Sequence, residues 1–187
     1  MTVIPDTARV YEQNVEALLI KAMKGKLSAP CLEELRAKGF DVAKLKSEYS
    51  YRDYLGAIVV VRRHVYKDVR DDAAAYRAMG QAMVDGFLET MMGKALGPLM
   101  RVVGPSRLVE RLPSTFKSGN NYLVSAVTKL AERDYEFRVN YSEPHPAMTQ
   151  GVLERAVGGL GGARGVEVTH TRPVADGDWV YRIRWPA

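Results

Sequence analysis

The chain has 187 residues, of which 47% are hydrophobic and 26% are charged. This length and composition are typical of one globular domain whose core forms without disulfides or metal ions. The longest apolar run, residues 55–61, is too short to cross a bilayer, and the N-terminus lacks the layout of a signal peptide. We therefore expect a single cytoplasmic domain covering residues 1–187.

The formal net charge of +5 raises the question of nucleic-acid binding, which uses clustered lysine and arginine. Here the basic residues are spread along the chain with acidic residues between them, and no basic tail is present. This pattern favours an ordinary solvated surface. Cys31 is the single cysteine and cannot form an internal disulfide, so we expect it to be a small buried or half-buried apolar residue.

Helical periodicity dominates the first two thirds of the chain. Gly39 follows one predicted helix where a left-handed cap is favourable, Pro98 is expected to kink or restart another, and Gly104 with Pro105 is expected to break it. The apolar residues 91–103 are expected in the middle of the fold. The predicted helices cover residues 7–23, 29–38, 51–65, a segment from Asp71 or Asp72 past Phe87, 91–103 and 105–112.

Alternation of apolar and polar residues replaces this period in the C-terminal third, which predicts strands. Asp176 and Gly177 are a strong turn signal between the last two strands. The predicted strands cover residues 122–130, 135–141, 166–172 and 179–185, with a helix over residues 146–160 between the two pairs. The fold class is therefore α+β: a mainly helical half (1–118) packed on an antiparallel sheet of order strand-strand-helix-strand-strand (119–187).

Known chemical motifs are missing from the sequence, including phosphate-binding loops, serine nucleophile elbows and paired cysteines. His64, His145 and His170 lie in different predicted elements without ligand spacing, so we expect no metal site. Gly80 and Gly86, inside a predicted helix, indicate close helix packing or a nearby ligand, with packing favoured. Nothing in the sequence argues for catalysis.

A polar segment, residues 114–122, joins the helical half to the sheet half. Gly119 is expected in a backbone conformation that other residues avoid. Asn120 and Asn121 are expected to tie down this turn through bonds to the backbone. The alternative is that their amides, together with Lys117, bind a polar or anionic group.

Several strings resemble an uncharacterised paralogous family found mainly in myxobacteria: VDGFLETMMGKALGPLMRVVGPSRLVERL, FKSGNNY, TQGVLERAV and YRIRW. The resemblance reaches back to LEELRAKGFDV and so covers nearly the whole chain. It implies an architecture rather than an activity. The order of elements in that family is similar to that of heme nitric-oxide/oxygen binding domains and of related small-molecule-binding and trafficking-adaptor domains.

A heme sensor of that kind carries a proximal histidine on the helix beneath the sheet and a Tyr-x-Ser-x-Arg signature for the propionates. Residues 85–113 contain no histidine, and the second predicted strand reads Tyr135-Glu136-Phe137-Arg138. We therefore expect no heme and no other cofactor.

The sequence favours a non-enzymatic sensory or regulatory module with an apolar pocket between the methionine-rich helices and the sheet. Methionine suits an adaptable pocket, but it suits an irregular core equally well. The alternative is a protein-interaction or dimerisation module with a solid core and no ligand. The candidate ligand-binding residues are Met83, Phe87, Met92, Leu96 and Met100, with a polar rim of Lys117, Asn120, Asn121 and Tyr122.

Overall fold

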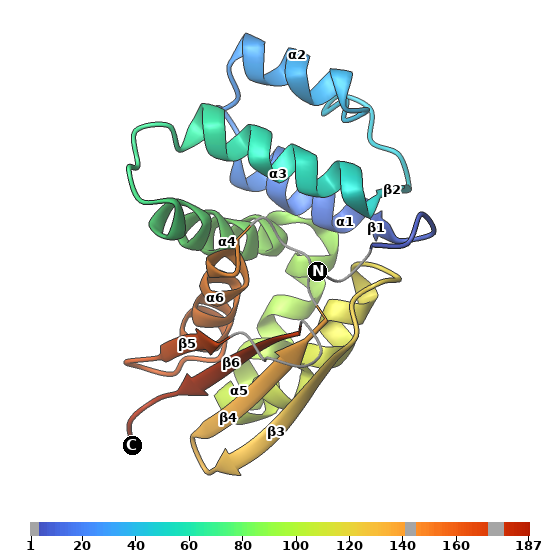
Figure 1. Ribbon diagram of the computed structural model, residues 1–187. Coiled ribbons are helices and arrows are strands. Elements are labelled where there is room, and N and C mark those ends of the chain that lie inside the picture. Colours follow the sequence, from blue (N-terminus) through green and yellow to red (C-terminus); the bar gives the residue numbers. More distant parts are fainter. Residues whose placement is uncertain (1–3, 141–144, 172–177) are drawn as a thin grey trace.

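The computed structural model describes residues 4–140, 145–171 and 178–187. Its early helices stack on one side of the long helix α4, and the four-stranded sheet lies on the other side (Figure 1). The elements in chain order are β1 (Arg9–Tyr11), α1 (Glu12–Val15), the π-helix η1 (Glu16–Ala22), α2 (Ala29–Ala37), β2 (Glu48–Ser50), α3 (Tyr51–Val65), α4 (Asp72–Glu89), α5 (Met91–Ser118), β3 (Ser125–Ala131), β4 (Asp134–Val139), α6 (Ala147–Glu154), the π-helix η2 (Arg155–Leu160), β5 (Glu167–Thr171) and β6 (Trp179–Arg184).

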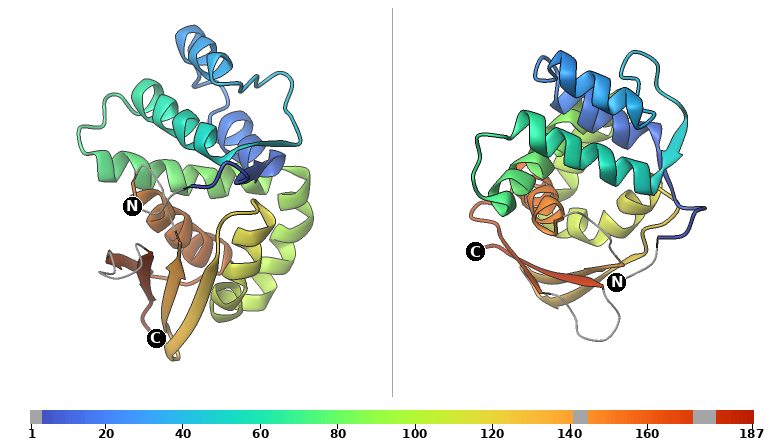
Figure 2. Two further views of the ribbon diagram at one scale, coloured as in Figure 1. Left: turned by 45° about the vertical axis from the view of Figure 1, so that its right-hand side comes forward. Right: turned by 45° about the horizontal axis from the view of Figure 1, so that its top comes forward.

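The main sheet has the strand order β3-β4-β6-β5, and every neighbouring pair is antiparallel. Phe137 of β4 pairs with Tyr181 of β6, and both side chains are fully buried on the inner face. The turned views in Figure 2 show α5 and α6 on this side of the curved sheet. The α+β class and the order strand-strand-helix-strand-strand are confirmed. The predicted Asp176-Gly177 turn lies outside the described residues.

Two hydrophobic clusters form the core. One gathers side chains of β1, η1, α2, α3 and the first half of α4, and the other lies between the sheet, α6, η2 and the end of α5. Helix α4 contributes to both clusters, and Leu123 packs against both. The prediction of one domain stays a prediction.

Glycines bring α4 unusually close to its neighbours. A Cβ atom on Gly80 would lie 2.0 Å from the carbonyl oxygen of Met148 in α6, and one on Gly86 would lie 2.1 Å from that of Ala17 in η1. From the other side, a Cβ on Gly151 of α6 would lie 2.0 Å from the carbonyl oxygen of Arg77. Helix packing therefore explains both glycines of α4, as the sequence favoured.

The N-terminal prediction is wrong in one respect, because the helix begins at Glu12 and residues 9–11 form β1 instead. This strand pairs with β2, and it also meets the segment after α5: the Tyr11 amide donates to the carbonyl of Gly119 (2.9 Å) and the Asn121 amide donates to that of Arg9 (3.1 Å). Gly119 and Asn121 are more than a hundred residues away along the chain, so local periodicity does not reveal these contacts.

Helix α2 ends as expected. Gly39 has φ +85°, and the amide of Phe40 donates to the carbonyl of Leu35 at 2.9 Å, which closes a Schellman-type cap. Cys31 of this helix is fully buried, as predicted, and burial is the main cause that raises the pKa of its thiol.

Helix α5 consists of two arms. The backbone leaves helical geometry at Gly104 (φ 77°, ψ 169°), which confirms the predicted break. The first arm (residues 91–103) continues through Pro98 instead of restarting there, and the second arm (residues 105–118) runs on to Ser118 rather than ending at residue 112. Among the described residues, no helix is long and apolar enough to cross a bilayer.

Candidate ligand-binding cavity

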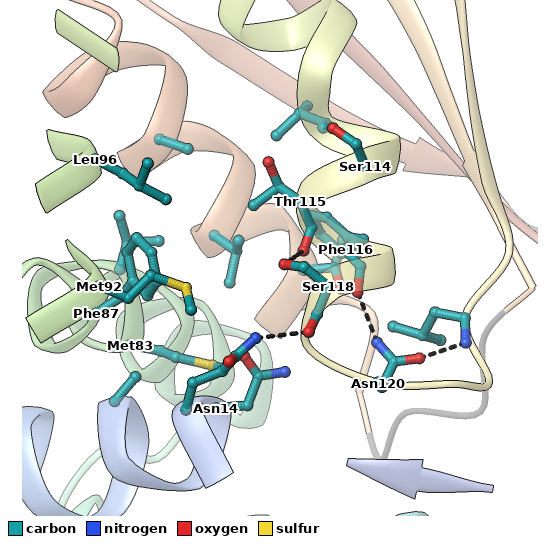
Figure 3. Close-up of a pocket in the computed structure, with 18 of the residues that line it drawn as sticks. Asn14, Met83, Phe87, Met92, Leu96, Ser114, Thr115, Phe116, Ser118 and Asn120 are labelled. Carbon is teal, nitrogen blue, oxygen red and sulfur yellow. Dashed lines mark hydrogen bonds between the residues drawn. The ribbon is translucent and has the colours of Figure 1, made fainter. Parts of the chain in front are cut away.

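An open cavity of about 400 Å³ lies between the two arms of α5 (Figure 3). Its floor comes from α4, α6 and η2, and α1, η1 and α3 close one end. This volume falls within the range of about 300–1,000 Å³ that is usual for small-molecule pockets. The lining residues are mostly apolar, and they come from at least seven segments of the chain: Val10, Gln13, Asn14, Ala17, Tyr51, Tyr54, Ile58, Met83, Val84, Phe87, Met92, Leu96, Leu99, Met100, Val103, Leu108, Arg111, Leu112, Ser114, Thr115, Phe116, Ser118, Asn120, Leu123, Met148, Thr149, Val152, Ala156 and Leu160.

The five apolar residues selected from the sequence all line this cavity. Met83 and Phe87 project from α4, one turn apart, while Met92, Leu96 and Met100 follow one another every four residues along the first arm. Figure 3 shows Met83, Phe87, Met92 and Leu96 on the same side of the cavity. Their convergence is a structural result, and ligand binding by them stays a prediction.

The first arm does not lie in the middle of the fold, contrary to the prediction. Met91 is 87% exposed, Leu99 is 52% exposed and Val102 is 83% exposed. One face of the arm lines the cavity, while Met91 and Val102 lie outside that lining and are exposed. Its apolar composition indicated a buried helix, and the structure instead makes it one wall of an open groove.

The cavity lies among helices rather than against the sheet. Its described lining includes no residue of β3, β4, β5 or β6. Aromatic side chains fill the space next to the sheet: Phe116 of the second arm contacts Phe137 at a ring-centroid distance of 5.0 Å, and Phe137 contacts Tyr181 at 6.3 Å. The apolar pocket, which the sequence placed between the helices and the sheet, therefore lies between the arms of α5 instead.

Polar groups concentrate where α5 ends. Gln13 donates to the carbonyl of Ser118 at 2.6 Å, and Asn14 donates to that of Gly119 at 3.2 Å. These side chains satisfy carbonyl groups that have no partner within the helix. Asn120 is buried, with an exposed fraction of 2%. Its side-chain NH₂ donates to the carbonyl of Phe116 at 2.8 Å, and its oxygen accepts from the amides of Tyr122 and Leu123 at 2.9 and 2.5 Å.

The predicted polar rim is only partly present. Asn120 lines the cavity, whereas Lys117, Asn121 and Tyr122 do not. Asn121 holds β1 in place. Its side-chain oxygen accepts from the amide of Arg9 at 2.6 Å, and its side-chain NH₂ donates to the carbonyl of Thr7, just before β1, at 3.0 Å. The ring of Tyr122 packs on Tyr51, in the hydrophobic cluster formed with β1, η1, α2 and α3, at a centroid distance of 5.1 Å.

The contacts of both asparagines are those of residues that fix the turn. The prediction for Gly119 is wrong, because its φ is −90° and any residue can adopt that value. A Cβ atom there would lie 2.4 Å from the side-chain nitrogen of Asn14, so a larger residue would require the Asn14 side chain to move.

Sequence reasoning missed the second arm as a wall of the cavity. Leu108, Arg111, Leu112 and Thr115 line it with the spacing of one helix face. The signal was present in the sequence, but the predicted helix stopped at residue 112 and excluded the last turn.

In residues 4–140, 145–171 and 178–187, no group of three or more His, Cys, Asp or Glu side chains could hold a metal ion. His64 forms a pair with Glu34 at 2.9 Å, and this hydrogen bond, together with Arg63, lowers the pKa of the Glu34 carboxyl. His170 lies 3.2 Å from the side-chain oxygen of Gln150, and burial followed by the charge of His145 lowers its pKa. Neither pair lines the cavity.

Comparison with known proteins decides the family. Residues 8–186 match the family described as a protein of unknown function (DUF2378). The chain belongs to the DUF2378 family. This confirms the resemblance inferred from its motifs, and no curated protein matches the sequence.

Solved structures of H-NOX domains share the fold of this DUF2378 protein. The oxygen complex of an oxygen-binding H-NOX domain related to soluble guanylate cyclases has a TM-score of 0.66 at 12% identity, over 94% of this chain and 92% of that one. An Fe(II) unliganded H-NOX mutant from K. algicida has a TM-score of 0.62 at 9% identity, over 94% and 95%. A T. tengcongensis H-NOX mutant has a TM-score of 0.64 at 12% identity, over 94% and 96%. At these identities the likeness shows the fold alone.

Proposed function

We propose that this protein is a non-enzymatic sensory or regulatory module of the cytoplasm that binds a small apolar ligand between the arms of α5. The observation that supports it most is the open, mostly apolar cavity of about 400 Å³, which native packing would otherwise fill. Methionine side chains line several of its walls, and their flexible thioethers adapt to ligands of different shape.

The residues of the cavity favour a ligand other than heme. Heme iron in proteins is usually held by His or Cys, with Met and Tyr as further choices. The described lining has no His or Cys, and the thioether of Met83 accepts a hydrogen bond from the hydroxyl of Tyr54 at 3.8 Å. Heme also brings two carboxylates, whereas Arg111 is the one cationic side chain in the described lining. The proposed ligand is therefore a small apolar molecule other than heme.

Titration with 1-aminoanthracene, an uncharged fluorescent apolar probe, tests the proposal. We expect saturable binding to one site. Val152→Phe should abolish it, because Val152 lines the cavity and a phenyl ring would occupy the space of the probe. Val59→Phe is the matched control: Val59 is 43% exposed on α3 and does not line the cavity. Equal binding by both variants, or no saturable binding by the native protein, would contradict the proposal.

The second candidate is a dimerisation module, which the exposed side of the first arm supports. Met91 and Val102 are apolar, largely exposed and outside the cavity lining. Exposed apolar groups that lie together commonly mark interaction sites. Light scattering tests this function: a concentration-dependent dimer that Val102→Glu dissociates would support it, and a monomer at high concentration would count against it.

A further inference from the structure

We infer that the ligand is an amphipathic monoanion, an organic acid with one long apolar tail, whose acid group is held by Arg111 at the mouth of the cavity. This inference rests on the proposed function and adds the chemical class of the ligand. It follows from the charge, the polarity and the shape of the lining.

Arg111 is the one charged side chain among the described residues that line the cavity. Within the described part of the chain, no carboxylate forms an ion pair with it. Arginines next to the cavity floor differ in this respect: Arg77 pairs with Glu154 and Arg155 pairs with Asp85, each at 2.6 Å. A guanidinium with no protein partner at the edge of an apolar cavity is suited to a carboxylate or sulfonate, which it can bind through two parallel hydrogen bonds.

The neighbouring polar groups do not compete with an anion for Arg111. Ser114 and Thr115 are one turn further along the second arm, and both hydroxyls donate to the backbone carbonyl of Arg111, at 2.8 and 3.2 Å. The carbonyl groups at the end of the helix carry partial negative charge that would repel an anion. Those of Ser118 and Gly119 accept from Gln13 and Asn14 and are thereby covered.

The remainder of the cavity suits an apolar tail. Across from Arg111, the first arm presents Met92, Leu96 and Met100, and Val152 and Ala156 lie on the floor. No carboxylate lies in the described lining that would repel an acid. One cation at the mouth and apolar walls behind it match a molecule with one anionic head and one apolar tail.

Isothermal titration calorimetry with dodecanoate and with 1-dodecanol tests the inference, since the two probes differ in the head group. We expect the native protein to bind dodecanoate about threefold to fivefold more tightly, the upper part of the range of a solvent-exposed ion pair. Arg111→Gln should remove that preference and leave dodecanol binding unchanged. Arg107→Gln is the matched control, because Arg107 is an exposed arginine one turn earlier on the same arm and does not line the cavity.

The outcomes separate this inference from the proposed function. If dodecanol binds and dodecanoate binds no better, or if Arg107→Gln has the same effect as Arg111→Gln, the anionic class is wrong while the apolar cavity stands. If neither probe binds, both proposals are wrong. Sedimentation with phosphatidylglycerol vesicles adds a further arm: binding to the vesicles that depends on Arg111, without binding of free dodecanoate, would assign Arg111 to a lipid surface and overturn the inference.

Discussion

Substitution of Gly80 by alanine tests the close packing of α4 on α6, which forms the floor of the cavity. The new methyl group would lie 2.0 Å from the carbonyl oxygen of Met148 and 3.0 Å from the amide nitrogen of Val152. Both are backbone atoms, so the helices must move apart. Overpacking of this kind costs up to about 3 kcal/mol, and the higher helix propensity of alanine returns about 1 kcal/mol. We expect a net loss of about 2 kcal/mol in the free energy of unfolding.

Gly56→Ala is the matched control, because this glycine also lies inside a helix, α3. Its nearest neighbours would be the side-chain carbons and nitrogen of Lys38, at 3.5–3.7 Å, which is ordinary contact with a flexible chain. The higher helix propensity of alanine should therefore raise the free energy of unfolding by about 1 kcal/mol. For a protein of this size, 1 kcal/mol shifts the melting temperature by about 2–4 °C. Calorimetry should therefore show a decrease of about 4–8 °C for Gly80→Ala and an increase of about 2–4 °C for Gly56→Ala. Shifts of the same sign would refute the packing argument.

Three further predictions concern the segments around the cavity. Gly104→Ala should lower the free energy of unfolding by about 1–3 kcal/mol in urea titrations, because φ 77° with ψ 169° is a backbone region that glycine alone occupies readily; an unchanged midpoint would contradict this. Asn120→Ala should cost about 3 kcal/mol, since three hydrogen bonds of a buried side chain are lost, and Asn121→Ala should cost about 1 kcal/mol at its exposed position. A larger loss for Asn121→Ala would oppose this order. The depressed pKa of His170 means that the unfolded chain binds its proton more readily, so stability is full above the ordinary pKa of 6.5 and falls as the pH is lowered through the folded value. Urea midpoints between about pH 7 and pH 5 should decline less steeply in His170→Asn, and parallel declines would argue against this role.

Much of the fold could be predicted because it depends on local signals. Gly39 ends α2 in the left-handed conformation, and Gly104 with Pro105 divides α5, as their sequence positions indicated. The strand pairs and the intervening helix follow from the change of period after the helical half. Local patterns did not reveal the pairing of residues 9–11. This strand pairs with β2, and Val10 forms a further bridge to Asn120.

The sequence could predict which residues of the site share a helix face. Met92, Leu96 and Met100 share one face of the first arm, and all three line the cavity. Whether such a face meets a packed core or a cavity depends on how far apart the elements lie, and the sequence does not contain that distance. Arg111 was missed for a related reason, since its importance comes from the apolar surroundings that the opposite arm provides.

Native mass spectrometry of the freshly purified protein, compared with its denatured mass and accompanied by a visible absorption scan, tests the central claim most directly. We predict extra mass of a small molecule that is lost on denaturation, with no Soret band, and no extra mass on Val152→Phe purified in parallel. A native protein that carries no extra mass, whether monomer or dimer, would contradict the proposal of a resident ligand. A Soret band would show that the cavity holds heme after all.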